Sequence, residues 1–425
     1  MPGPIASVVG VVVPARLGAS YRWLWSAASV TNIGDGIVLA AGPLLVASQT
    51  RDAFIVSLAF FAEVVPSLVF GTVAGVIVDR VDRRRLVIGV NVVRALVLTV
   101  LATAIGTGSV SVPVVLVALF LLGTSETFAD LASSSLLPRL VPRESIGLAN
   151  ARMQSAYILM NQLIGPPIGA FLFVAGMAIP FASDAVCYGL GAVLISRIAT
   201  SAAPAPGQAA EKAGRASVWH ELAEGFRWLR SHPPMRTLAL TIVAFNVTFG
   251  AAWSVLVLYA GDQLGMSSIG YGLLTTAMAV GGIIGTSAYG ALERRFSLAD
   301  IMRVGLLIET GTHLTLALTR SSEVALLTMV VFGAHAFIWG TTSITIRQRA
   351  VPDELMGRVS GIYHVGLNAG IVVGAPIGGL LARSFGITAP FWFGFVGSAI
   401  LVTVLWRELR HIGHAGEATP STVAS

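Results

Sequence analysis

Three segments of this 425-residue chain recur in the same order half a chain later. The matching pairs are 71–80 with 285–294, 141–144 with 351–354, and 165–170 with 374–379. The spacing within each pair is also nearly the same, so chance is a poor explanation. Two like halves in a hydrophobic chain are typical of secondary transporters, which bind their substrate between the repeats near the membrane midplane.

The composition requires a membrane. The chain is 55% hydrophobic and only 11% charged, with a mean hydropathy of +0.81. A water-soluble domain of this length could not bury so much apolar surface. Apolar stretches of membrane-spanning length repeat along the chain, and they predict twelve helices, six on each side of a polar stretch near 200–235. The predicted helices are 22–48, 54–78, 86–107, 112–136, 146–175, 180–199, 237–260, 269–291, 301–319, 324–346, 356–383 and 389–406.

The predicted fold is therefore an all-α membrane protein of two six-helix bundles related by pseudo-two-fold symmetry. We expect the bundles at 1–199 and 237–410, a cytoplasmic linker at 200–236, and a disordered tail at 411–425. Residues 200–216 are typical of a flexible linker. Residues 217–232 place apolar side chains at helical spacing, which predicts an amphipathic helix on the inner membrane face. A structural strap between the halves is the plain interpretation, and a regulatory role is the alternative.

Charge placement predicts the orientation. The chain has 27 basic residues, and most of them fall in the termini and the connections on one side. Only Arg51, Arg320 and Arg383 fall in the opposite connections. Positive residues stay in the cytoplasm, so we expect a multi-pass protein of the bacterial inner membrane with both termini cytoplasmic. The net charge of +6 is then a topology signal, and no nucleic-acid partner is expected, because the arginines are dispersed over short loops.

The loop after the second predicted helix carries a specific motif. Residues 75–85 resemble the signature loop of the major facilitator superfamily, with Asp82 in place of the usual glycine. An acidic side chain there can face a helix N-terminus, and the arginines can reach carboxylates on neighbouring helices. The resemblance implies that the loop latches the cytoplasmic side, which assigns Asp79, Arg80 and Arg84 to gating.

The fifth predicted helix carries Gly165, Pro166 and Gly169, which resemble the antiporter motif of the same superfamily. The match is partial, because Ala170 stands where the motif has a second glycine. The wider pattern over residues 123–170 is similar to the bacterial branch that holds macrolide-efflux and enterobactin-exporter proteins. This resemblance implies a drug:proton antiporter with the major facilitator fold and export driven by the proton gradient.

Ionisable residues inside a bilayer cost about 2.5–3.5 kcal/mol each on insertion scales, so each needs a reason. Asp35 lies near the middle of the first predicted helix and Glu126 near the middle of the fourth. The resemblance implies that helices one, four, seven and ten line a central cavity. Because a carboxylate removed from water takes up a proton more readily, we rank Asp35 first and Glu126 second as proton carriers, with Glu63 a weaker candidate. A helix-capping or bridging role is the alternative for both.

Other polar residues inside the predicted helices have different explanations. Asp130, Arg94 and Arg152 fall at similar depth, and we assign them to a structural or gating cluster. Glu309 and His313 share a face of the ninth helix, where a mutually satisfied pair is favoured over a proton relay.

Helices seven and ten carry aromatic residues and no acidic one. Aromatic side chains suit a large apolar molecule held by stacking, with a few polar groups for orientation. Each aromatic could instead face lipid or pack between helices. The predicted substrate-binding residues are Asn246, Phe249, Trp253, His335 and Trp339.

Several functional classes are excluded. Lys212, the only lysine, does not follow a phosphate-binding glycine pattern, and neither H-E-x-x-H nor G-x-S-x-G is present, so neither an ATP-driven pump nor an enzyme is predicted. We expect no cofactor and no metal. The predicted partners are a small-molecule substrate, protons and the lipid bilayer, and we expect a monomer. An exporter of a siderophore or metabolite, an importer with the same fold and a transport-dead sensor remain alternatives.

Overall fold

The computed structural model describes residues 15–199 and 218–413. The predicted flexible linker of residues 200–216 and the last part of the predicted tail lie outside these ranges. Within them, eleven helices are long and apolar enough to cross a membrane, and Ala389–Leu405 is a shorter apolar helix. The prediction of an all-helical membrane fold is confirmed.

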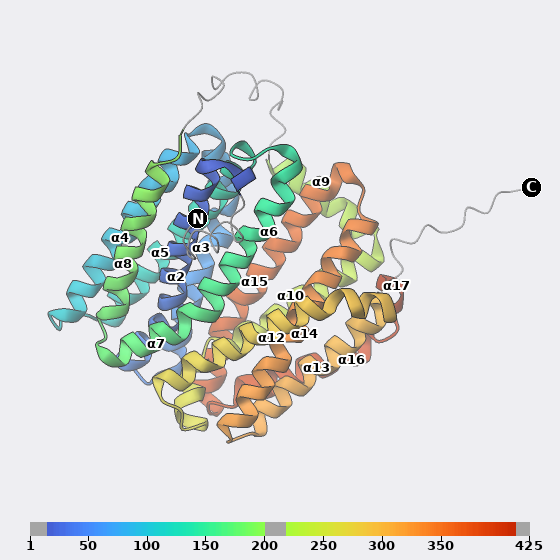
Figure 1. Cartoon of the computed structure of the whole chain (residues 1–425). Helices are drawn as coiled ribbons and strands as arrows, with labels where there is room; N and C mark the ends of the chain where they lie inside the picture. Colours follow the sequence, from blue (N-terminus) through green and yellow to red (C-terminus); the bar gives the residue numbers. More distant parts are fainter. Residues whose placement is uncertain (1–14, 200–217, 414–425) are drawn as a thin grey trace, which may run out of the picture. The chain divides into compact units, whose positions relative to one another are not determined.

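The helices follow one another along the chain in two sets (Figure 1). The first half contains η1 (Ala15–Leu17), α2 (Gly18–Gln49), α3 (Ala53–Arg80), α4 (Arg83–Gly106), α5 (Val112–Leu136), η2 (Leu137–Arg139), η3 (Arg143–Ser145), α6 (Ile146–Ala156), the π-helical turn η4 (Tyr157–Ile164), α7 (Gly165–Ala175) and α8 (Ile179–Ser196). The second half contains α9 (Val218–Ser231), α10 (Pro233–Trp253), α11 (Leu256–Leu258), the π-helical turn η5 (Tyr259–Gln263), α12 (Ser268–Arg295), α13 (Leu298–Leu318), α14 (Ser322–Ala350), α15 (Asp353–Phe385), α16 (Ala389–Leu405) and α17 (Glu408–Gly413).

The described chain divides into two compact units. Unit 1 holds residues 15–50, 62–199 and 268–276, and unit 2 holds 51–61, 218–267 and 277–413. Each unit is thus one half of the chain together with a short segment from the other half. The exchanged segments are the connection and first turns that begin α3 and the first turns of α12.

Within unit 1, α2 packs against α8, α7 and η4, and α4 packs against α5 and α8. The crossing of α2 with η4 and α7 depends on glycine. A Cβ atom at Gly36 would meet the Asn161 carbonyl, and one at Gly165 would meet the backbone of Gly36. Helix backbones can approach this closely only where neither residue has a side chain. The predicted antiporter-motif residue Gly165 therefore lies at a helix crossing, and Gly169 likewise faces the Ile37 backbone.

Unit 2 repeats this order of packing. Helix α10 packs against α15 and α16, and α13 packs against α14 and α16. The α10–α15 crossing again uses glycine, because a Cβ atom at Gly374 or Gly378 would meet the backbone of Val247 or Ala251. The sequence repeat thus corresponds to a repeated set of helix contacts.

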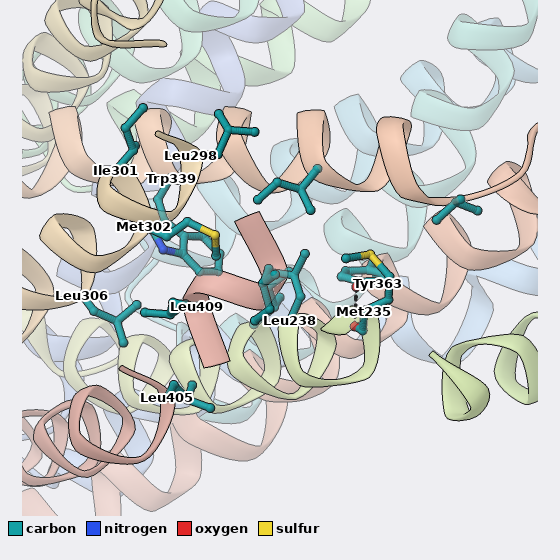
Figure 2. Close-up of a cluster of buried hydrophobic side chains, with 14 of the residues drawn as sticks. Met235, Leu238, Leu298, Ile301, Met302, Leu306, Trp339, Tyr363, Leu405 and Leu409 are labelled. Carbon is teal, nitrogen blue, oxygen red and sulfur yellow. Dashed lines mark hydrogen bonds between the residues drawn. The ribbon is translucent and has the colours of Figure 1, made fainter. Parts of the chain in front are cut away.

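A cluster of buried apolar side chains lies inside unit 2. Met235, Leu238, Met302 and Leu409 lie in it, and the Tyr363 hydroxyl donates to the Met235 carbonyl at 2.6 Å (Figure 2). Leu229 of α9 joins this cluster. The amphipathic helix expected at 217–232 is therefore present as α9 and is packed onto α15, where Glu224 also pairs with Arg358 at 2.9 Å.

An arginine near the start of one helix binds the end of another in both units. In unit 1, Arg84 donates to the carbonyls of Ile195, at 3.2 Å, and Ser196. In unit 2, Arg303 donates to the Trp406 carbonyl at 2.7 and 3.1 Å. The last carbonyls of a helix lack partners within the helix and carry partial negative charge, so each arginine satisfies and stabilises a helix C-terminus.

Candidate functional site

Asp35 occupies a narrow part of α2, because it lies between Gly34 and Gly36. A Cβ atom at Gly34 would meet the carboxyl group of Asp184 on α8. Gly36 makes the close crossing with Asn161 described above. The two glycines therefore let neighbouring helices come near the backbone on either side of Asp35.

Asp35 is bound by an arginine and a tyrosine. The Tyr188 hydroxyl of α8 donates to Asp35 Oδ1, and Arg94 Nη1 of α4 lies 3.8 Å from the same oxygen. The Arg94 guanidinium also lies 4.6 Å from the centre of the Tyr188 ring, in the range of a cation–π contact. Arg94 is 4% exposed, so its charge is balanced by these side chains and not by bulk water.

The same guanidinium reaches the second predicted proton carrier. Arg94 Nη2 lies 3.6 Å from Glu126 Oε2 on α5. The structure thus places Arg94 between Asp35 and Glu126, whereas the sequence had grouped it with a gate. We call Asp35, Arg94, Glu126, Asp184 and Tyr188 the Arg94 cluster.

The remaining predicted members of this region differ in position. Glu63 of α3 is half-buried, at the point where the α3 backbone faces Gly123 of α5. Asp130 lies one turn beyond Glu126 and is exposed. Arg152 of α6 accepts a hydrogen bond at its backbone carbonyl from the Trp25 indole at 3.3 Å. Arg152 therefore contacts the start of α2 and not the Arg94 cluster.

Asp184 is a member that the sequence analysis missed. It is 1% exposed, and neither of its carboxyl oxygens has a hydrogen-bond partner. An ionised carboxylate without partners is very costly to bury, so this geometry favours the neutral, protonated carboxyl. The signal was available, because Asp184 is an acidic residue inside a predicted apolar helix, as Asp35 is.

Charge is unbalanced around Arg94. Asp35, Glu63, Glu126 and Asp184 are buried or half-buried, and the cation that acts electrostatically on all four is Arg94. One guanidinium can compensate one carboxylate. The other carboxyl groups must hold protons or face water.

Unit 2 presents aromatic side chains on α10 and α14. The rings of Phe249 and Trp253 stack with centres 4.6 Å apart, and Phe332 lies 4.6 Å from Trp253. Phe245 stacks on Trp339 at 5.4 Å. The indole N–H groups of both tryptophans are buried and have no hydrogen-bond partner. We call these five rings the aromatic patch.

The two polar residues predicted to bind substrate already have protein partners. The Asn246 side-chain amide donates to the Ile242 carbonyl at 2.8 Å. His335 Nε2 lies 3.2 Å from Glu309 Oε2, and His313 Nε2 lies 3.2 Å from Glu309 Oε1. The expected Glu309–His313 pair therefore has a third member from α14.

The structure describes the side chains of only some of the predicted gating residues. The side chain of Asp79 lies outside the described part of the structure, and Arg80 is exposed. Arg84 binds the end of α8, and Asp82 accepts a hydrogen bond from the Arg85 backbone N–H at 2.8 Å. Asp82 is thus the N-cap of α4. Among the described residues, no group of three or more His, Cys, Asp or Glu side chains is arranged to hold a metal ion.

The fold and sequence both resemble known transporters. A bacterial homologue of the human lysosomal transporter Spinster has a TM-score of 0.73 and 15% identity, with 96% of this chain and 100% of that chain covered. The multidrug efflux pump Tap of Mycolicibacterium fortuitum is 26% identical over 377 residues, which cover 86% of this chain and 90% of Tap. The enterobactin exporter EntS of Escherichia coli K12 is 26% identical over 428 residues, with 96% and 95% covered.

The family profile described as transmembrane secretion effector matches residues 12–419. This match covers both helical halves and agrees with the signature loop and glycine motif in the sequence. The chain belongs to the transmembrane secretion effector family of the major facilitator superfamily, which is a family of membrane transporters and not of enzymes.

Proposed function

We propose that this protein is a proton-coupled exporter of small hydrophobic or amphipathic molecules that works by alternating access. The observation that carries the proposal is the excess of carboxyl groups over arginine in the Arg94 cluster. A transporter that uses the proton gradient needs side chains that can hold a proton in one state and lose it in another.

The Arg94 cluster has the parts for this exchange. When Asp35 is ionised, Arg94 and Tyr188 compensate it. When Asp35 takes up a proton, Arg94 still has Glu126 as an anionic partner at 3.6 Å. The guanidinium therefore keeps a counter-ion in both states, which avoids the cost of a buried, unpaired cation.

The aromatic patch supports the proposed substrate class. Stacked rings bind flat or apolar molecules, and a buried indole N–H without a partner can donate to an oxygen of the substrate. The names of Tap and EntS, an efflux pump and an exporter, support outward transport over import. We therefore propose that this chain also transports small hydrophobic or amphipathic molecules outward, across the bacterial inner membrane.

The test is a proton-flux assay in everted membrane vesicles that hold a respiration-driven pH gradient. Candidate compounds, among them antibiotics and a siderophore, are added one at a time to vesicles with the wild type or Asp35→Asn. We expect a substrate to dissipate the gradient in the wild type only. Asp262→Asn is the matched control, because Asp262 is an exposed aspartate with a side chain 51% accessible.

Two results would contradict the proposal. The first is substrate-driven proton flux in Asp35→Asn that equals the wild type at equal protein level. The second is uptake of the same compound into intact cells down the proton gradient, which would identify an importer.

A further inference from the structure

Glu309 of α13 is a buried carboxylate held by two imidazoles. His313 Nε2, one turn along α13, lies 3.2 Å from one carboxylate oxygen, and His335 Nε2 of α14 lies 3.2 Å from the other. The three residues are 2%, 0% and 4% exposed. They form a compact polar group inside unit 2.

The surroundings of this group are apolar. The Trp253 ring meets the His313 ring edge-on at 6.4 Å, and Phe245 and Phe332 lie 6.4 and 6.2 Å from the His335 ring. Glycines make room for the imidazoles, because a Cβ atom at Gly305 would lie 3.0 Å from the His335 ring and one at Gly394 would meet the His313 ring. The group therefore has little contact with water.

The other charged side chains on α10, α13 and α14 engage groups outside this site. Helix α16 has no ionisable residue, and the electrostatic partners of Glu309 are the two histidines alone. The remaining charges on α10, α13 and α14 engage other groups: Arg236 binds the Arg230 carbonyl, Arg303 binds Asp300 and Trp406, Glu323 binds Ser321, Arg347 lies over the Tyr363 ring, and Arg349 binds Glu293.

The charge of the group follows from its hydrogen bonds. If both imidazoles are neutral and donate through Nε2–H, the ionised carboxylate leaves a net charge of −1 with no arginine to balance it. One further proton makes the group neutral overall. Because an uncompensated charge is costly in an apolar interior, the protonated group is the favoured form.

The position of that proton also follows from the geometry. His313 Nδ1 is buried and has no hydrogen-bond partner. A proton on this nitrogen would bury an N–H group without an acceptor. The same nitrogen of His335, Nδ1, is not among the buried atoms that lack a partner. His335 is therefore the imidazole that carries the charge, and His313 acts as a neutral donor.

We propose that Glu309 and His335, with His313 as a neutral donor, form a proton-binding site inside unit 2. The site is separate from the Arg94 cluster and rests on side chains of unit 2 alone, so it stands even if Asp35 is not a proton carrier. It lies directly against Trp253, Phe245 and Phe332 of the aromatic patch. Loss of its proton would place a net negative charge beside the rings that we propose bind substrate.

The test is nitrogen-15 spectroscopy of the full-length protein, labelled at histidine, in lipid nanodiscs at pH 7.5. A charged imidazole gives two similar nitrogen signals, and a neutral one gives two widely separated signals. Histidines in water, with an ordinary pKa of about 6.5, are mostly neutral at this pH. We expect one charged histidine in the wild type and none in Glu309→Gln or His335→Gln.

His232→Gln is the matched control, because it removes an exposed histidine and leaves the charged signal in place. Size-exclusion profiles show which variants are folded, and two independent variants keep the test decisive if one of them is not. A wild type without a charged histidine at pH 7.5 would overturn the proposal. A charged histidine that persists in Glu309→Gln or in His335→Gln would also overturn it.

Discussion

Arg94 shows how one side chain can set the charge of a membrane interior. Its guanidinium lies between Asp35 on α2 and Glu126 on α5 and stacks over Tyr188 on α8. A planar guanidinium can lie between two carboxylates and stack on an aromatic ring at once, which the single ammonium group of lysine cannot. Three helices of unit 1 thus depend on one residue of α4.

Removal of Arg94 should therefore destabilise the protein. We expect Arg94→Gln to lower the free energy of unfolding by about 3–5 kcal/mol, because buried carboxylates lose their cation. The double variant Arg94→Gln with Asp35→Asn should recover part of that loss. Thermal unfolding in detergent measures both, and equal melting temperatures for the single and double variants would contradict the pairing.

The aromatic patch gives a separate prediction. Trp253→Ala removes a ring that stacks on Phe249 and contacts Phe332. We therefore expect the substrate concentration at half-maximal transport to rise about tenfold, which corresponds to about 1.4 kcal/mol of binding free energy. Trp253→Phe keeps a ring and should have a smaller effect. The readout is the vesicle assay, with the half-exposed Trp392→Ala as control. Unchanged half-saturation in Trp253→Ala would remove Trp253 from the substrate site.

For individual residues, the sequence was most informative about which single ionisable side chains lie inside the membrane-spanning helices. Asp35 and Glu126 stand out because an acidic residue in an apolar stretch needs a reason, and the same rule would have found Asp184. The sequence could not show which charges meet. Arg94 and Asp35 lie on different helices, as do Glu309 and His335, and their pairing depends on how those helices are rotated and packed.

At the scale of helices, glycine sets the distance between α2 and α7. The Gly36–Gly165 crossing leaves no room for a methyl group, because a Cβ atom at Gly36 would lie 2.9 Å from the Gly165 Cα. By contrast, a Cβ atom added at Gly89 of α4 would meet no atom within 4 Å. The two glycines therefore differ in what a methyl group would do.

We expect Gly36→Ala to lower the free energy of unfolding by about 1–3 kcal/mol and to reduce transport, because α7 must move away from Asp35. Gly89→Ala should be neutral or stabilising by about 0.5–1 kcal/mol, since alanine favours the helix. Melting temperatures of the two variants in detergent provide the comparison. A Gly36→Ala protein as stable as Gly89→Ala would show that the crossing can widen at no cost.

Helix positions could be predicted well from hydropathy, and local irregularities could not. The helix expected at 112–136 is observed as Val112–Leu136, whereas the one expected at 237–260 ends at Trp253. The residues beyond Trp253 are still apolar, so hydropathy does not mark this end. The π-helical turn at Tyr157–Ile164 likewise interrupts an apolar run, and it occurs where Asn161 meets Gly36 of α2.

For the whole molecule, the two units share their helix packing and differ in their charges. Unit 1 buries carboxyl groups around an arginine, and unit 2 buries a carboxylate between two histidines. The repeat in the sequence predicts the shared packing, because the repeated residues are glycines, prolines and helix ends. The buried polar groups inside the helices are not repeated, so the internal symmetry gives no information about them.

The excess of carboxyl groups in the Arg94 cluster has an electrical consequence. Under the proposed antiport, a proton that enters on one of these groups in exchange for a neutral substrate would carry one positive charge across the membrane. A membrane potential of 100 mV adds about 2.3 kcal/mol to each such exchange. We therefore expect a potassium ionophore that abolishes the voltage to slow the export of a neutral substrate even at an unchanged pH gradient. Export of a monovalent cation against a single proton would not respond, so the sensitivity to voltage, together with the charge of the substrate, would give the number of protons exchanged in each cycle of the proposed antiport.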